Sequence, residues 1–222
     1  MNKTDELIAA LSRKPRAISL APTATMVLGA TVAMIVALAL SIAWLKPRTD
    51  LTLALIVQND IFLLKLVFTV CVVLAALPIV RDLSVPGRRI GLWSALVAAP
   101  FVVILVLALR ELAGTPAREW SHHFEHASWL ECLWQIPALA FPAFVILTFA
   151  VRYLAPTNLV RTGAYMGLVA GGIGAIGYAF HCHDDSVAFV AVSYTLAIAE
   201  MTVVGALLGP RILRWTSHSR IA

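Results

Sequence analysis

Six long apolar stretches divide this chain, and they limit its possible folds more than any other feature. They cover approximately residues 25–45, 61–80, 90–110, 132–151, 163–181 and 187–209. A helix of about 20 apolar residues crosses the hydrocarbon core of a bilayer, and each stretch is long enough to do so. Short connections force neighbouring helices to run antiparallel. The sequence therefore predicts an all-α integral membrane protein, a bundle of six transmembrane helices.

The composition excludes a water-soluble domain of this length. Of the 222 residues, 60% are hydrophobic and 13% are charged, and the mean hydropathy is +0.88. Soluble domains carry roughly a quarter charged residues. We therefore divide the chain into a head with a short amphipathic helix at 1–24, a transmembrane domain at 25–210 and a tail at 211–222.

The distribution of lysine and arginine predicts that both termini are cytoplasmic. Basic residues near the ends of spans gather on the cytoplasmic side of a membrane. The head, the second and fourth connections and the tail carry Lys3, Arg13, Lys14, Arg16, Arg81, Arg88, Arg89, Arg152, Arg161, Arg211, Arg214 and Arg220. The opposite side carries fewer, namely Lys46, Arg48, Lys65, Arg110 and Arg118. Because the charges are dispersed over several membrane-flanking sites, the net charge of +5 indicates no direct binding to nucleic acid.

Glu200 is the clearest ionisable residue at membrane depth, near the middle of the sixth stretch. Such a residue is by default a candidate ion or proton site. The alternative is a protonated carboxyl that bonds a neighbouring helix through Ser193, Thr202 or another hydroxyl. A transporter normally carries several deep polar groups, so we favour the structural interpretation.

Lys65 lies in the first turns of the second stretch, close enough to the outer surface for its ammonium group to snorkel to water. Asn59 and Asp60 precede it, and they can cap the helix or pair with Lys65. Neither arrangement requires a role in transport.

Glycines recur on one face of the fifth stretch and again in the sixth. Gly163, Gly167, Gly171 and Gly174 are spaced at intervals of four, four and three residues, and two further glycines in the sixth stretch, at 205 and 209, repeat the spacing. Small residues on one stripe let helix backbones approach closely. The pattern predicts a close-packed helix interface and gives no information about a catalytic or binding site.

Candidate chemistry is concentrated on the outer side, where two cysteines are predicted to lie at equal height. Cys132 and Cys182 are equally distant along the chain from the connection near Thr157, so an antiparallel helix pair places them at equal height. Packed helices lie about 8–10 Å apart and a disulfide needs Cα atoms roughly 4.4–6.8 Å apart, so a bond is feasible if the cysteines face each other. The alternative is that both act as small apolar residues, which is our interpretation of Cys71.

The same region could hold a metal ion, because His, Cys and Asp are typical ligands of zinc and similar ions. The candidate ligands are Cys132, Cys182, His181, His183, Asp184, His122 and His126. Their spacing is loose, and solvated loop histidines are the alternative. The string from His122 to His126 matches the H-x-x-E-H pattern of a zinc peptidase class, but a short connection supplies neither the long helix nor the substrate cleft of those enzymes. We expect no catalysis and no required cofactor, with at most a transient metal ion at the outer face.

The sequence of the head predicts a segment that docks onto another protein. Asp5 and Glu6 suit the positive end of a helix dipole, and Leu7, Ile8 and Leu11 form one apolar stripe. A helix this short does not hold its shape alone. Its early acidic charge argues against the membrane surface, so a protein groove is the expected partner.

Four segments carry a recognisable pattern: residues 4–11, 132–157, 181–186 and 205–211. In them the chain resembles the NrsF family of six-span membrane anti-sigma factors. The resemblance covers nearly the whole chain and implies that the head helps to bind an extracytoplasmic-function sigma factor at the bacterial inner membrane. It also implies that Cys132 and Cys182 serve in sensing heavy metals or oxidants outside. His183 departs from the family, in which we expect Pro more often at this position.

Two functional hypotheses follow from the sequence. The first is a membrane-bound anti-sigma factor, a regulator that sequesters its sigma factor and releases it when the outer cysteine pair responds to metal or oxidative stress. The second is a small multi-span transporter or metal-efflux component that uses Glu200 and the outer histidines. Substrate uptake that depends on Glu200 would favour the second.

Overall fold

The computed structural model describes residues 6, 22–48, 59–88, 90–116, 120, 128–152, 154 and 156–214. Within these ranges the chain forms helices and turns and contains no strand. In chain order the elements are α2 (Pro22–Leu40), η1 (Ser41–Leu45), α4 (Asp60–Ser84), η2 (Leu92–Val97), α5 (Ala98–Gly114), α6 (Ser128–Arg152), α7 (Leu159–Ala179), α8 (Val187–Phe189), η4 (Val190–Tyr194) and α9 (Thr195–Ile212). Both η1 and η4 are π-helical turns, and η2 is a 3₁₀ turn that runs into α5.

Six helical segments of the described chain are long and apolar enough to cross a membrane, as the six apolar stretches of the sequence predicted. They are Pro22–Leu45, Asp60–Ser84, Ser94–Gly114, Leu130–Arg152, Leu159–Ala179 and Val187–Ile212. The third differs from the prediction because it continues through Arg110 and Glu111 to Gly114. Glu111 binds another helix at that end of the bundle, so this polar pair does not terminate the span.

Asparagine side chains begin two of the spans. The Oδ1 atom of Asn59 accepts a hydrogen bond from Phe62 N at 2.9 Å, and that of Asn158 accepts one from Arg161 N at 3.1 Å. Each bond satisfies a backbone N–H group that has no partner within the first helical turn. The capping role predicted for Asn59 is therefore confirmed.

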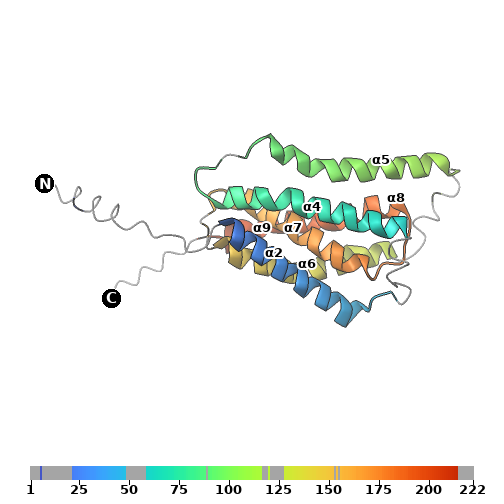
Figure 1. Ribbon diagram of the computed structural model, residues 1–222, viewed down its shortest axis with the longest axis horizontal. Helices are drawn as coiled ribbons and strands as arrows, with labels where there is room; N and C mark the ends of the chain where they lie inside the picture. The colour runs from blue at the N-terminus through green and yellow to red at the C-terminus, as the bar shows by residue number, and fades with distance from the viewer. Residues whose placement is uncertain are drawn as a thin grey trace.

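Helix α7 lies in the middle of the bundle (Figure 1). Its neighbours are α2, α4, α6 and α9. In the most apolar part of this span 72% of the residues are buried, compared with 17% in the span that contains α5. The connection that follows α7 is therefore held at the end of the most enclosed helix.

Glycines allow α7 and α9 to approach closely. A Cβ atom at Gly163 would lie 2.8 Å from the Cα atom of Gly209, and one at Gly167 would lie 2.8 Å from the carbonyl carbon of Met201. Side chains do not fit at such distances, so the predicted close-packed interface is confirmed at these two positions. Gly174 differs from the expected single stripe, because a Cβ there would lie 2.7 Å from an α6 carbonyl oxygen. Helix α7 is surrounded by neighbours and uses glycine on more than one face.

Helix α5 lies at the edge of the bundle beside α4 (Figure 1). Phe68 of α4 packs edge-on against Phe101 of α5, with ring centroids 5.4 Å apart. Other large apolar side chains of α5, among them Val102, Leu105 and Leu109, are exposed. An apolar surface of this kind is typical of a membrane or protein contact.

Replacing Gly167 with alanine should destabilise the bundle by about 1 to 3 kcal/mol, as overpacking of a close contact does. Gly114→Ala is the matched control, because a Cβ atom at Gly114 meets nothing within 4 Å. Unfolding of the purified protein by SDS in mixed micelles, followed by circular dichroism, measures both effects. Equal stability of the two variants would contradict the close contact.

Candidate functional site

The connection between α7 and α8, residues 180–186, contains one of the two predicted regulatory cysteines. We call it the thiol turn. Within it Cys182 is 3% exposed, and Cys132, near the start of α6, is completely buried. Both are free thiols. The side chains of Cys132 and Cys182 form a hydrogen bond with each other. The structure thus brings together the two cysteines that residue counting placed at equal height.

Two tyrosines lie beside the cysteine pair. Tyr178 belongs to the last turn of α7, Tyr194 belongs to η4, and their ring centroids are 6.0 Å apart. Both are buried, and both interact electrostatically with the thiols. The sulfur atoms are therefore surrounded by protein groups.

Lys65 reaches the same place from α4 and is completely buried. Its Nζ atom lies 3.7 Å from the Sγ atom of Cys182 and 3.5 Å from the carbonyl oxygen of that residue. It also donates to the backbone carbonyl of Asp184 and lies 3.3 Å from the Oδ1 atom of Asp185. The prediction that Lys65 snorkels to water is wrong, because the thiol turn offers anionic and carbonyl partners at the depth of its ammonium group.

Asp185 joins the thiol turn to two earlier parts of the chain. Its carboxylate accepts from Arg48 Nη1 at 3.3 Å and from Asn59 Nδ2 at 3.2 Å, in addition to its ion pair with Lys65. Burial acts to raise the pKa of Asp185, but the hydrogen bonds from Arg48 and Asn59 and the charge of Lys65 hold that pKa below its ordinary value. Arg48 also donates to the carbonyl oxygen of Cys182 at 3.1 Å. Asp185 is therefore ionised at neutral pH and anchors the turn.

Glu111 of α5 holds the end of the thiol turn that leads into α8. Its carboxylate accepts from Ser186 Oγ at 3.2 Å, from Val187 N at 3.2 Å and from Ala188 N at 2.6 Å. A carboxylate at a helix N-terminus is stabilised by the unpaired N–H groups and by the helix dipole. Glu111 was not among the residues predicted from the sequence. The available signal was a carboxylate that follows Arg110 near the end of an apolar span.

The thiol turn is consequently in contact with five of the six spans and with the segment that follows the first. The segment after η1 supplies Arg48, α4 supplies Lys65, α5 supplies Glu111 and α6 supplies Cys132. The remaining two spans flank the turn directly. A chemical change at this turn can therefore affect the packing of the whole bundle.

The environment of Cys182 favours its thiolate form. The hydrogen bond from Cys132 lowers the pKa of Cys182, burial raises it, and the Lys65 ammonium group lowers it, so that the net shift is downward. The thiolate is the form of cysteine that attacks oxidants and binds metal ions. Of the two cysteines, Cys182 is therefore the one whose thiolate form is favoured by its surroundings, since the Lys65 ammonium group lies beside its sulfur.

The predicted metal ligands do not form one cluster. Among the residues that the structure describes, no three His, Cys, Asp or Glu side chains form a group that could hold a metal ion. The Nδ1 atom of His181 lies 3.0 Å from the carbonyl oxygen of Lys46, and His183 is exposed. The predicted ligands His122 and His126 lie outside the described residues, so their part in a metal site stays a prediction.

Glu200 is exposed on the surface of α9. The hydroxyl of Thr202, one of its expected partners, instead donates to the carbonyl oxygen of Ile198 at 2.9 Å. Within the ranges described above, no side-chain hydrogen bond of Glu200 is found, and the expected link to a neighbouring helix is absent. The link is absent because Glu200 lies on the exposed side of α9 and does not face a neighbouring helix.

The structure describes one residue of the predicted docking segment, Glu6. Glu6 is helical and exposed. The other residues of that prediction, Asp5, Leu7, Ile8 and Leu11, lie outside the described residues, so the docking role of the head stays a prediction.

Comparison with known proteins identifies relatives over most of the chain. The family described as "Negative regulator of sigma F" matches residues 11–215. The Anti-sigma-F factor NrsF of Caulobacter vibrioides is 31% identical over 218 residues, which cover 96% of this chain and all of that protein. The Probable anti-sigma-F factor NrsF of Azospira oryzae is 32% identical over 176 residues, which cover 79% of this chain and 82% of that protein. No solved structure matches the chain.

Replacing Asp185 with asparagine should lower the stability by about 1 kcal/mol at neutral pH, since partial exposure screens its ion pairs. The pKa of Asp185 is lowered in the folded state. Its contribution is therefore complete above the unfolded pKa of about 3.9 and is lost as the pH falls through the lower folded value.

Thermal unfolding in a non-ionic detergent at several pH values tests this expectation. The difference between wild type and Asp185→Asn should be constant near neutral pH and should shrink below about pH 4. Asp184→Asn is the control, because the bond from Lys65 goes to the backbone oxygen of that residue. A difference that persists in acid would contradict the ionic role of Asp185.

Proposed function

The chain belongs to the NrsF family, and on that premise we propose that it is a membrane-bound anti-sigma factor whose outer cysteine pair controls the release of its partner. Membership gives the protein a regulatory role. The partner that we propose is an extracytoplasmic-function sigma factor, held at the inner membrane of a bacterium. The observation that carries the sensory part of the proposal is the contact of the thiol turn with five spans and with the segment that follows the first.

Insertion into a membrane accounts for the apolar exterior of the bundle. Leu28, Leu74, Phe141 and Leu207 are each more than half exposed, although they belong to four different spans. In water such a surface would cause aggregation, whereas lipid chains solvate it. The excess of Lys and Arg in the head, tail and even-numbered connections supports cytoplasmic termini and an outward thiol turn.

The sensing chemistry that we propose starts at Cys182. Its thiolate attacks one oxygen of a peroxide and becomes a sulfenic acid, and the second oxygen leaves as hydroxide. The thiol of Cys132 then attacks the sulfenic sulfur, forms a disulfide and releases water. A thiophilic metal ion would bridge the same two sulfurs and displace their protons.

Either event changes the contacts that hold the thiol turn. The Lys65 ammonium group lies next to the Cys182 sulfur, and it loses a negative partner when that sulfur enters a disulfide. Its bonds to Asp184 and Asp185 then carry the link between α4 and the turn. A switch of this kind shifts an equilibrium by the difference in binding between the two states, usually about 1 to 3 kcal/mol. That range changes partner release several-fold.

The transporter alternative is not favoured. Glu200 lies on the exposed side of α9, and its expected partner Thr202 is bonded within its own helix. A proton or ion site requires convergent polar groups inside the bundle. The acidic residues that do converge, Asp185 and Glu111, hold the thiol turn in place.

Replacing Cys132 and Cys182 together with serine should leave partner binding within about twofold of wild type and abolish release by hydrogen peroxide or Zn²⁺. Cys71→Ser is the control and should respond as wild type does, since Cys71 lies apart from the pair. Co-purification of the sigma factor with membranes, before and after treatment, measures the response. Release from the double variant on induction would overturn the sensory mechanism while leaving the family assignment in place.

Replacing Leu7 and Leu11 with aspartate should abolish partner binding without impairing membrane insertion, because these residues form the apolar stripe of the head. Lys3→Ala with Lys14→Ala is the matched double control in the same segment, and it should retain the partner. Pull-down from detergent extract with sigma-factor detection measures binding. Retention of the partner by the leucine variant would move the docking site to the inner connections, where Arg81 and Arg88 are the next candidates.

A further inference from the structure

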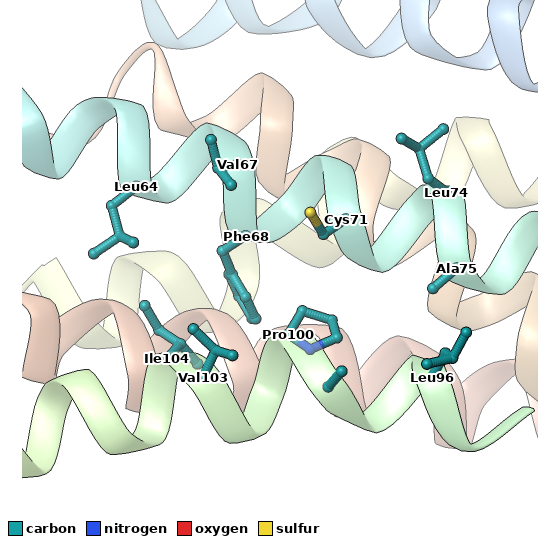
Figure 2. Close-up of a pocket in the computed structure, with 11 residues that line it drawn as sticks. Leu64, Val67, Phe68, Cys71, Leu74, Ala75, Leu96, Pro100, Val103 and Ile104 are labelled. Carbon is teal, nitrogen blue, oxygen red and sulfur yellow. The ribbon is translucent and has the colours of Figure 1, made fainter.

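An apolar cavity of about 390 Å³ separates α4 from α5 (Figure 2). Phe68 and Cys71 line it from α4, and Pro100 and Val103 line it from α5. Figure 2 shows Phe68 directed toward α5, with Val103 directed back toward α4. The volume of this cavity lies within the range of about 300–1,000 Å³ that is usual for ligand pockets. An apolar space of this size is a poor site for water, which needs polar partners.

A second cavity of about 410 Å³ continues the first toward the C-terminal end of α4. The two share Leu74, Ala75 and Leu96, and so they form one groove. The second half is more polar than the first, because Arg81, Asp82 and Ser94 contribute to its wall. The groove is thus apolar along α4 and α5 and has charged side chains at one end.

An excess of positive charge lies at this end, where Arg81 and Asp82 line the groove and Arg88, outside the lining, contacts Asp82. Asp82 Oδ1 lies 2.9 Å from Arg81 Nη2 and 2.6 Å from Arg88 Nη1, so one carboxylate is shared by two guanidinium groups. Both arginines are partly exposed. One positive charge remains uncompensated within this trio. Guanidinium groups bind phosphate oxygens well because they present several N–H donors in one plane.

We propose that the groove binds an anionic phospholipid, with an acyl chain in the apolar half and its phosphate at Arg81 and Arg88. The inference rests on the proposed topology, which puts this end of α4 in the cytoplasmic leaflet, and it does not depend on the sigma factor. Basic pockets between helices on that side are typical sites for anionic head groups. The lipid chain would pack beside the Phe68–Phe101 contact that already joins α4 and α5.

Native mass spectrometry of the purified full-length chain in detergent tests the proposal with phosphatidylglycerol and phosphatidylcholine as probes. Phosphatidylglycerol should bind at least about fivefold more tightly, the equivalent of roughly 1 kcal/mol for one uncompensated charge. Arg81→Gln with Arg88→Gln should remove this preference. Asp82→Asn should increase it, because both guanidinium groups become available to the phosphate. A gain of affinity cannot arise from misfolding.

Two further variants separate the groove from general charge and from free phosphate. Arg152→Gln, at the same end of α6, removes an exposed arginine away from the groove and should leave the preference unchanged. Ala99→Phe places a ring in the apolar half of the groove, where Ala99 is exposed. It should lower the affinity for both lipids several-fold. Inorganic phosphate alone should not displace phosphatidylglycerol.

Several outcomes would overturn the lipid site. They are equal affinity for the two lipids in wild type, no gain with Asp82→Asn, unchanged binding with Ala99→Phe, or displacement by inorganic phosphate. The topology is checked separately by reporter fusions at residues 120 and 222. A periplasmic C-terminus would contradict the cytoplasmic location of the lipid site, whereas the lipid affinities would still decide whether the groove binds an anionic phospholipid. Neither assay involves the sigma factor, so failure of the lipid proposal is distinguishable from failure of the proposed function.

Discussion

The close contact between α7 and α9 is the constraint on which the rest of the bundle depends. At Gly163 and Gly167 the backbone of α9 occupies the space that a side chain would need. Helix α7 can therefore lie in the middle, with α2, α4 and α6 on its other sides. The thiol turn begins directly after α7, so the packing of this helix determines where Cys182 lies.

The charged groups at the thiol turn are compatible with an apolar bundle because each has partners there. An unpaired buried ammonium group would cost several kcal/mol. Lys65 avoids this cost through Asp185 and the carbonyl groups of the turn. Since the same ammonium group lies beside the Cys182 sulfur, the chemical state of that sulfur and the attachment of α4 are physically linked.

The number of spans and the position of the cysteine pair could be predicted because both depend only on length and on counting along the chain. The direction of a side chain around its helix could not. These helices are apolar on most sides, so hydrophobic periodicity does not identify the buried face. Lys65 was expected at the surface and is buried, whereas Glu200 was expected inside and is exposed. Glu111 was overlooked because its partners, two backbone N–H groups and the Ser186 hydroxyl, belong to a distant segment.

The buried lysine has a consequence for the biosynthesis of the chain. The partners of Lys65 lie 117 to 120 residues further along, and those of Glu111 lie 75 to 77 residues further along. A chain is synthesised from its N-terminus, so both charges leave the ribosome long before the groups that neutralise them. In the membrane insertion that we propose, each can until then reach water only from the end of its own helix. The last connection between these helices to be translated, the thiol turn, is therefore the one that supplies the partners of both charges.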